Sequence, residues 1–252
     1  MTYAHRLQTN RFEFKYMIDE VRARAIRDYV RPFLVHDENA DPKLSYSYAI
    51  HSIYLDSDSY SLAQATLQGL KNRFKLRMRF YDDKPDSAVF CEIKRRMNDV
   101  ICKERVAIHR DSVQPFLRRR FPERADLLRY TPKAFDTLRH FCSLRNAIQA
   151  DRGILVSYLR EAFVTPHDDS VRLTFDRNVE SGRFDEHLRI NRHDERFQPR
   201  LQGLILELKF TDRFPFWMHD LVHEFNLQRS PMAKYVACAV SLDSLTRGLL
   251  AG

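Results

Sequence analysis

Cysteine is scarce in this chain of 252 residues, which contains only four. Cys91, Cys102, Cys142 and Cys238 form no Cys-x-x-Cys pair and no closely spaced framework, so we expect reduced thiols rather than disulfides or a zinc site. Cys91 and Cys102 fall at apolar positions of predicted strands. We therefore expect them to be small buried hydrophobic residues without a redox role.

Long apolar runs are also missing. The longest, around Tyr235 to Val240, is far shorter than the roughly 20 residues of a membrane-spanning helix. The first ten residues, MTYAHRLQTN, contain no apolar signal core. No internal repeat, low-complexity tract or linker divides the sequence. These absences predict one domain over residues 1–252, without a transmembrane segment and located in the cytoplasm.

The composition is that of a folded, basic protein. Hydrophobic residues make up 44% of the chain, which is enough for a sizeable core. The formal net charge of +8 and the pI of about 9.4 favour a polyanionic partner. Net charge alone does not separate nucleic acid, nucleotide, polyphosphate and anionic lipid, so the positions of the charges have to decide.

Polar side chains recur two residues apart in seven short stretches, with apolar residues between them. The stretches carry Glu13 and Lys15; Lys75, Arg77 and Arg79; Glu92 and Lys94; Lys103 and Arg105; Tyr158 and Arg160; Arg172, Thr174 and Asp176; and Glu207 and Lys209. Residues i and i+2 of a strand share a face, so each stretch has one charged and one apolar face. Because the apolar faces carry bulky side chains such as Phe12, Phe14 and Phe80, we interpret them as the core side.

These patterns predict an α+β fold, an eight-stranded antiparallel β-barrel tunnel with a charged interior that is coated by α-helices. The expected strands are roughly 10–17, 46–56, 72–82, 87–97, 100–109, 153–163, 170–177 and 203–211. The expected helices are about 19–33, 58–69, 112–120, 132–149, 213–227 and 231–249. A hairpin turn is expected at Asn98-Asp99.

Cations dominate the predicted interior. They are Lys15, Lys75, Arg77, Arg79, Lys94, Lys103, Arg105, Arg160, Arg172 and Lys209, against Glu13, Glu92, Glu207 and Asp176. A nucleoside triphosphate or a chain of phosphates would supply the missing negative charge, and the carboxylates suit a hard divalent cation. The alternative is that these charges lie on the solvated face of an ordinary antiparallel sheet.

The same segments resemble a known family. They are RFEFKY at 11–16, SIYLD at 52–56, KLRMRFY at 75–81, EIK at 92–94, KER at 103–105, YLREAF at 158–163, RLTFD at 172–176, ILELKF at 205–210 and AKY at 233–235. In this order they are similar to the polyphosphate polymerase (VTC) domain, one of the triphosphate tunnel metalloenzymes. The resemblance implies a tunnel of eight antiparallel strands and transfer of the terminal phosphoryl group of ATP to polyphosphate, with Mn²⁺ or Mg²⁺.

The resemblance and the interior inventory together assign the candidate site. We expect catalytic roles for Arg77, Arg79, Lys94, Lys209 and Lys234, phosphate binding by Lys15, Lys75, Lys103, Arg105, Arg160 and Arg172, and metal binding by Glu207 with Glu13 and Glu92. Glu207 could instead form a structural ion pair, Asp176 could support Arg172 or a helix, and Lys234 could be a solvated helix residue.

Two positions depart from the family pattern. Arg11 stands where the wider superfamily often has the first of two glutamates, which argues against the triphosphatase branch. Ala233 replaces the serine that usually precedes the Lys-Tyr pair, here Lys234-Tyr235.

The predicted function is that of an ATP-dependent polyphosphate polymerase, a phosphotransferase. The partners are ATP and polyphosphate, with no specific nucleic acid, and export would require a membrane protein on another chain. The alternatives are a metal-dependent triphosphate hydrolase or cyclase of the same fold, and a non-catalytic sensor or carrier of polyphosphate or other polyanions.

Overall fold

A computed structural model describes residues 11–98, 100–166, 168, 170–183, 186–190, 196–230 and 233–241. Residue contacts divide the chain into two compact units. The first unit consists of Met1–Tyr48, Leu159–Arg177 and Leu201–Met232. The second consists of Ala49–Tyr158, Asn178–Arg200 and Ala233–Gly252. The expectation of a single domain stays a prediction, and the two units are considered one at a time.

The strands confirm the α+β class with antiparallel pairing. They are β1 (Arg11–Ile18), β2 (Val35–His36), β3 (Ser47–Asp56), β4 (Asn72–Phe80), β5 (Val89–Met97), β6 (Val100–Ile108), β7 (Arg152–Val164), β8 (Val171–Arg183), β9 (Arg196–Phe197) and β10 (Leu204–Thr211). All eight predicted strands are present, and the two additional ones, β2 and β9, have two residues each. Such short strands are missed because two residues cannot display an alternating pattern.

The strands form one sheet in the order β1-β10-β8-β7-β3-β4-β5-β6, with β2 beside β7 and β9 beside β8. Within the part of the chain that the structure describes, no pairing joins β6 to β1, so the path of the sheet is open. The short connection between β5 and β6 is the predicted hairpin. Asn98 has φ of 54° there, a left-handed conformation that asparagine tolerates well, and Asp99 lies outside the described residues.

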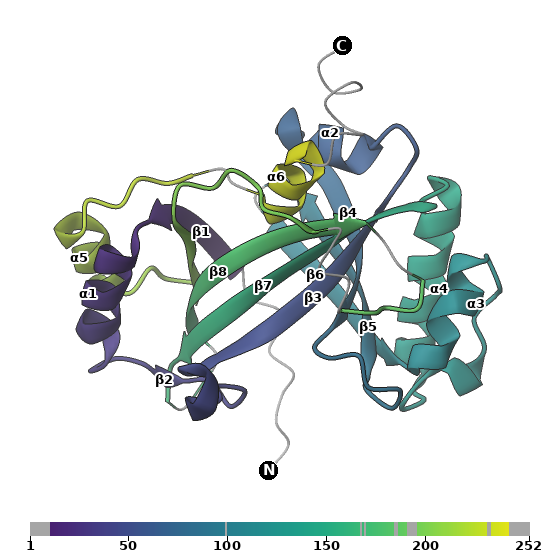
Figure 1. Cartoon of the computed structure of the whole chain (residues 1–252), viewed down its shortest axis with the longest axis horizontal. Coiled ribbons are helices and arrows are strands. Elements are labelled where there is room, and N and C mark those ends of the chain that lie inside the picture. Colours follow the sequence, from purple (N-terminus) through teal and green to yellow (C-terminus); the bar gives the residue numbers. More distant parts are fainter. Residues whose placement is uncertain are drawn as a thin grey trace. The chain divides into compact units, whose positions relative to one another are not determined.

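In the first unit, two helices cover the apolar face of β1, β10 and β8. They are α1 (Glu20–Val30) and α5 (Phe216–Glu224), which lie side by side in Figure 1. Asp19 caps α1 by accepting a hydrogen bond of 2.7 Å from the Arg22 amide. Ile26 and Met218 pack with Leu206 and Leu208 in one hydrophobic cluster.

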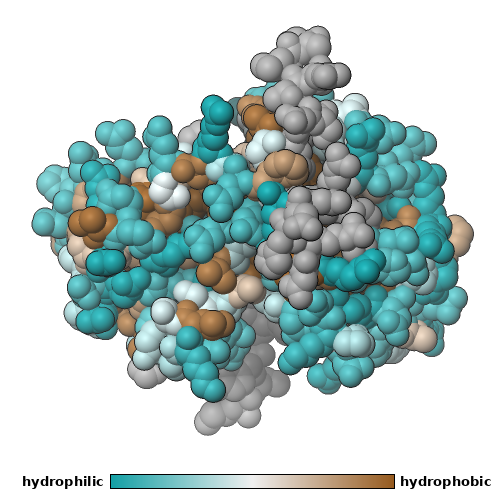
Figure 2. Space-filling view, in the orientation of Figure 1, coloured by the Kyte–Doolittle hydropathy of each residue, from teal (hydrophilic) through white to brown (hydrophobic). Residues whose placement is uncertain are grey.

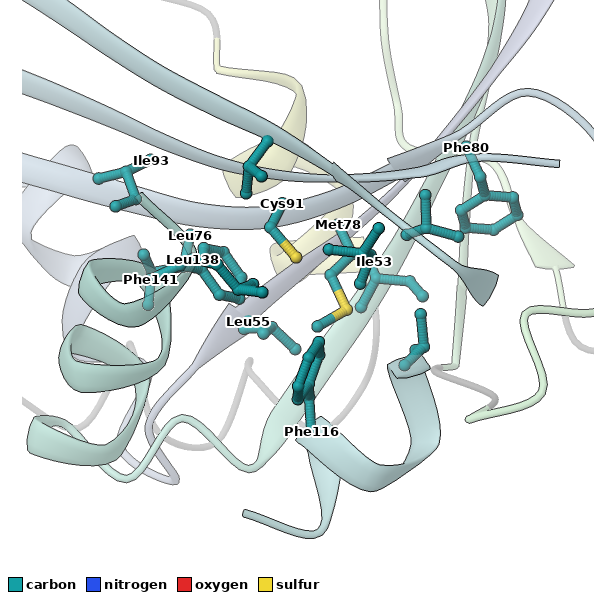
Figure 3. Close-up of a cluster of buried hydrophobic side chains, with 14 of the residues drawn as sticks. Ile53, Leu55, Leu76, Met78, Phe80, Cys91, Ile93, Phe116, Leu138 and Phe141 are labelled. Atoms are coloured by element: carbon teal, nitrogen blue, oxygen red, sulfur yellow. The ribbon is translucent and has the colours of Figure 1, made fainter. Parts of the chain in front are cut away.

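In the second unit, the apolar faces of β3, β4, β5 and β6 are covered by α3 (Val113–Leu117) and α4 (Pro132–Ala147). Figure 3 shows Phe116 of α3 and Leu138 and Phe141 of α4 pointing toward Leu76 and Met78 of β4. Each of these five side chains is at most 2% exposed. This burial holds the sheet in place, so that the opposite faces of the strands are left to the charged residues.

Two further helices of the second unit lie side by side in Figure 1, α2 (Ser61–Leu67) and α6 (Lys234–Ser241). All six predicted helices are found, most of them shorter than expected, and residues 242–249 of the last one fall outside the described part.

The surface is predominantly hydrophilic on the face in Figure 2, with scattered apolar side chains. No helix among the described residues is both long and apolar enough to cross a bilayer. All four cysteines are free thiols, with Cys91 and Cys238 buried, and Cys102 and Cys142 half-buried.

Candidate phosphate-binding site

Strand register places the predicted interior residues on common faces. In the first unit, Glu13 lies opposite Lys209, which in turn lies opposite Arg172. The next row runs Lys15, Glu207 and Thr174. Residues directly opposite in an antiparallel pair share a face, so the parity predicted from the sequence holds in these strands. We call the charged group of the first unit the Glu207 cluster: Glu13, Lys15, Arg160, Arg172, Thr174, Asp176, Glu207 and Lys209.

The second unit has its own charged face. Arg77 lies opposite Glu92, and Glu92 lies opposite Arg105. We call this group the Glu92 cluster: Lys75, Arg77, Arg79, Glu92, Lys94, Lys103 and Arg105, together with Lys234 from α6.

Glu207 is the centre of the first cluster and is 4% exposed. Its carboxylate contacts Lys209 Nζ at 2.7 Å, Arg160 Nη2 at 3.4 Å and Lys15 Nζ at 3.9 Å. Lys15 also contacts Glu13 at 3.0 Å, so it links both predicted metal ligands of this unit. Glu207 does form ion pairs, and since its partners are cations predicted to be catalytic (Lys209) or phosphate-binding (Arg160 and Lys15), the pairing is part of the candidate site.

Asp176 supports Arg160, whereas the sequence predicted that it would support Arg172 or a helix. Its two carboxylate oxygens accept hydrogen bonds from Nε and Nη2 of Arg160, both at 2.7 Å, while Asp176 is 0% and Arg160 6% exposed. Such a two-point contact fixes the plane of the guanidinium. Asp176 therefore orients Arg160, not Arg172.

Arg172 has partners that sequence reasoning missed. It forms an ion pair with Asp37 and donates a hydrogen bond of 3.1 Å to the Tyr48 hydroxyl, which itself donates to Asp37 at 3.0 Å. Burial raises the pKa of Tyr48 to about 12, so it remains a donor. Asp37 follows β2 in a loop, where no periodic pattern marks it.

Thr174 contributes a buried hydroxyl beside Glu207. The residue is 0% exposed, and its Oγ1 has no hydrogen-bond partner among the residues that the structure describes. An unsatisfied buried hydroxyl is costly, and a phosphate oxygen or a water on a bound cation would satisfy it.

Glu92 is the centre of the second cluster and is fully buried. Arg77 forms an ion pair with one carboxylate oxygen, while Lys103 and Arg105 contact the other at 2.9 and 3.4 Å. Burial alone would raise the pKa of Glu92, but Arg77, Arg79 and Lys103 outweigh it and hold the pKa well below the usual range. Glu92 is therefore an anion that organises the cations around it.

Three lysines stand directly opposite one another across β4, β5 and β6. The register pairs Lys75 with Lys94 and Lys94 with Lys103. Like charges in directly opposite positions destabilise a sheet, unless an anion lies between them. Burial lowers the pKa of Lys103 to about 8 despite the opposing effect of Glu92, with Arg77 contributing to the decrease. The row therefore concentrates positive charge on this face of the sheet.

Lys234 and Arg79, both in the second unit, contact the same residue, Tyr158. Arg79 donates to the hydroxyls of Ser52 at 3.4 Å and Tyr158 at 3.5 Å. The Lys234 ammonium lies 5.1 Å from the centroid of the Tyr158 ring, a cation–π distance, and the residue is 8% exposed. Lys234 is thus buried within its unit and is not a solvated helix residue.

Known proteins are similar to this chain along nearly its whole length. The chain matches the family model of the VTC domain over residues 10–242, and no curated protein sequence matches it. Among solved structures, it is similar to that of a candidate adenylate cyclase from Bacillus halodurans, with a TM-score of 0.49 and 13% identity over 90% of this chain and 94% of that one. It is also similar to the Mimivirus capping enzyme triphosphatase, with a TM-score of 0.34 and 9% identity over 87% and 88%. Because the family model spans nearly all of the sequence, the chain belongs to the VTC domain family.

Proposed function

We propose that this protein is an ATP-dependent polyphosphate polymerase. A terminal oxygen of the polyphosphate chain forms a bond to the γ-phosphorus of ATP, the bond from that phosphorus to the β,γ-bridging oxygen breaks, and ADP leaves. The polymer grows by one phosphate, so atoms and charges balance without any further reactant. Membership in the VTC domain family supports polyphosphate or triphosphate chemistry, and the reaction itself is our proposal.

The observation that carries the proposal is the lysine row Lys75, Lys94 and Lys103 beside the Glu92 ion pairs. A surface sheet would alternate charges of opposite sign across strands, whereas this row places three cations in register. A polyphosphate chain carries negative charge on every residue and can contact several of these ammonium groups at once. Such a surface favours a repeating polyanion over a single small anion.

The residues of the Glu207 cluster fit a divalent cation. Mg²⁺ is usually held by one or two carboxylates, with the remaining positions filled by substrate phosphate oxygens and waters. Glu207, assisted by Glu13, supplies the carboxylates, and the unsatisfied Thr174 hydroxyl lies opposite Glu207 in the register. Glu92 lies in the second unit, where Arg77, Lys103 and Arg105 contact it, and its predicted role as a metal ligand stays a prediction. A bound cation would neutralise charge on the triphosphate.

The lysine and arginine side chains would position the phosphates and neutralise their charge. Phosphoryl transfer passes through a loose transition state with charge spread over the equatorial oxygens, so catalysis is mainly positioning and charge neutralisation. In the second unit, Arg77, Arg79, Lys94 and Lys234 would contact the transferring phosphoryl group, and Lys75, Lys103 and Arg105 would bind flanking phosphates. In the first unit, Lys15, Arg160 and Arg172 would bind phosphates, and the catalytic role of Lys209 stays a prediction. Arg160 is fixed for this task by Asp176, and Arg172 by Asp37.

Transfer to phosphate is favoured over hydrolysis by the proton chemistry of the site. A terminal phosphate is already ionised and needs no general base, whereas a water nucleophile usually needs an oriented base. In the described strands, no histidine lies on the charged faces defined by the register. The carboxylates of Glu92 and Glu207 are each engaged by several cations, and the pKa of Glu92 lies well below its usual range because of Arg77, Arg79 and Lys103, which makes Glu92 a weak base.

The test is incubation of purified protein with ATP and Mn²⁺, followed by phosphorus NMR and gel analysis for ADP, orthophosphate and polyphosphate. Glu207→Ala and Arg77→Ala should lose polymer formation. Glu104→Gln is the matched control, because Glu104 pairs with His140 at 3.0 Å and is absent from both clusters.

The products separate the candidate functions. ADP with polymer in wild type and in Glu104→Gln, but not in the two site variants, would support the polymerase. ADP with orthophosphate and no polymer would indicate a hydrolase instead. No turnover despite tight binding of inorganic tripolyphosphate would indicate a sensor or carrier.

A further inference from the structure

Lys234 and Tyr235 are consecutive residues at the start of α6, and they have different surroundings in the second unit. Successive helical residues point about 100° apart, so one side chain can anchor the helix while the other faces a site. Tyr235 is 2% exposed, and its hydroxyl donates a hydrogen bond of 2.6 Å to Asp56 Oδ2. Lys234 lies against the Tyr158 ring instead.

Asp56 is itself held rigidly. It is the last residue of β3 and is 1% exposed. Its carboxylate accepts hydrogen bonds from the backbone amides of Ser57 at 2.8 Å and of Leu62 and Ala63, both at 3.0 Å. These donors belong to the segment that enters α2 and to its first turn. Asp56 therefore presents an immobile acceptor to Tyr235, and a charged acceptor makes this a strong hydrogen bond.

The aromatic ring of Tyr235 connects α6 with Arg77 of the Glu92 cluster through Tyr54. It stacks on Tyr54 with ring centroids 4.7 Å apart and an interplanar angle of 13°. The Tyr54 hydroxyl accepts a hydrogen bond of 3.1 Å from Arg77, which forms the ion pair with Glu92. Burial, and then the neighbouring Asp56, raise the pKa of Tyr235 far above its ordinary value, so its hydroxyl stays protonated and remains a donor.

We infer that Asp56 and Tyr235 are positioning residues that fix the orientation of α6 and thereby place the Lys234 ammonium in the Glu92 cluster, where it binds a phosphate group. This inference rests on the proposed function for the role of Lys234. Neither Asp56 nor Tyr235 touches substrate. The hydrogen bond between Tyr235 and Asp56 acts on phosphate binding through Lys234, whereas the Tyr235 ring acts through its stacking on Tyr54.

A double-mutant cycle tests this dependence. The variants are Tyr235→Phe, which keeps the stacked ring and removes only the hydroxyl, Lys234→Met, and the double variant. The probe is inorganic tripolyphosphate in metal-free buffer, with its dissociation constant measured by calorimetry. Each single variant should bind about tenfold more weakly, the equivalent of one lost charge-assisted contact. The double variant should bind no more weakly than Lys234→Met, because residues that act through one another are non-additive.

A second readout follows Lys234 directly. Reductive methylation of lysines, read by mass spectrometry, should be blocked at Lys234 by tripolyphosphate in wild type and should proceed in Tyr235→Phe. Ser241→Ala is the matched control on α6. It removes the 2.8 Å hydrogen bond between Ser241 and Ser181 at the other end of the helix, and should leave both readouts unchanged. Asp56→Asn, which keeps one acceptor oxygen, repeats the test from the acceptor side if Tyr235→Phe fails to fold.

Each outcome decides between the explanations. Additive losses in the double variant, or equal losses in Ser241→Ala, would mean that Tyr235 only stabilises the fold, and would overturn the inference. Unchanged binding in Tyr235→Phe would also overturn it. If Lys234→Met binds normally, the assigned role of Lys234 fails, and the positioning role fails with it. Since binding is measured without ATP, these results hold whether or not the protein synthesises polymer.

Discussion

Replacing Glu92 with glutamine should destabilise the empty protein and strengthen its binding of polyphosphate at the same time. The carboxylate is fully buried and is contacted by Arg77, Lys103 and Arg105. Removing one partner of a buried ion pair leaves uncompensated charge and costs about 3–5 kcal/mol. Urea unfolding of Glu92→Gln without ligand should show a loss of this size in the free energy of unfolding.

Phosphate should restore much of that loss. In wild type, Glu92 repels any anion that enters the cluster, whereas the variant presents the same cations without the repulsion. If only about 1.4 kcal/mol of repulsion is relieved, tripolyphosphate should bind about tenfold more tightly. At a concentration about 100 times the dissociation constant, a ligand adds about 2.7 kcal/mol to the free energy of unfolding. The stabilisation by one fixed tripolyphosphate concentration should therefore be larger in Glu92→Gln than in wild type.

Glu161→Gln is the matched control for this experiment. Glu161 is 2% exposed and pairs with Arg27 and Arg177, outside both clusters. It should lose comparable stability, and tripolyphosphate should stabilise it only as much as it stabilises wild type. Equal ligand stabilisation in Glu92→Gln and wild type would refute the view that the Glu92 cluster binds phosphate. Weaker binding in Glu92→Gln only when Mn²⁺ is present would instead identify Glu92 as a metal ligand.

Three further predictions concern single contacts. Arg160→Met should lower the free energy of unfolding, measured by urea titration, by about 3–5 kcal/mol because Asp176 is left buried and unpaired. The double variant Arg160→Met with Asp176→Leu should recover part of the lost stability. No recovery would contradict the pairing. The pKa of Lys103 is lowered from 10.5 to about 8, so its ammonium group should be charged below pH 8. The affinity for tripolyphosphate, measured by calorimetry, should therefore fall as the pH rises above 8. Lys103→Arg should abolish that fall. His51 is buried beside Ser157, and burial lowers its pKa from 6.5 to about 4. The unfolded chain therefore binds a proton that the folded chain excludes, and stability should drop by about 3 kcal/mol as pH falls from 6.5 to 4, unlike in His51→Gln.

Much of the fold could be predicted from the sequence because alternation with a period of two residues determines which face of a strand is buried. Leu76 and Met78 lie in the core while Arg77 lies on the charged face, and the same alternation holds for Leu206, Glu207 and Leu208. The strands β2 and β9 carry no such signal. Helix ends were overestimated because amphipathic spacing continues into turns, which only backbone hydrogen bonds distinguish from helix.

The partners within the site were much less predictable. Parity places Arg160 and Arg172 on the charged face, yet it cannot say that Asp176 holds the first and Asp37 the second, since these contacts depend on side-chain reach and on a loop. The contacts of Asp56 could not be predicted for another reason. Its sequence position marks the end of a strand, and two of its three backbone partners, Leu62 and Ala63, reach it only when α2 forms.

The two clusters differ in charge balance, and this difference gives them different tasks. In the Glu207 cluster the ion-paired cations Lys15, Arg160, Arg172 and Lys209 are matched in number by Glu13, Asp176, Glu207 and Asp37, the partner of Arg172 from the loop after β2. In the Glu92 cluster, Arg77, Lys103 and Arg105 all contact the single carboxylate of Glu92. A balanced cluster can accept a cation and its bound phosphates without a large electrostatic cost, whereas a cationic cluster is most stable with an anion present. We therefore expect metal binding at Glu207, and metal-independent binding of the polyanion at the Glu92 cluster.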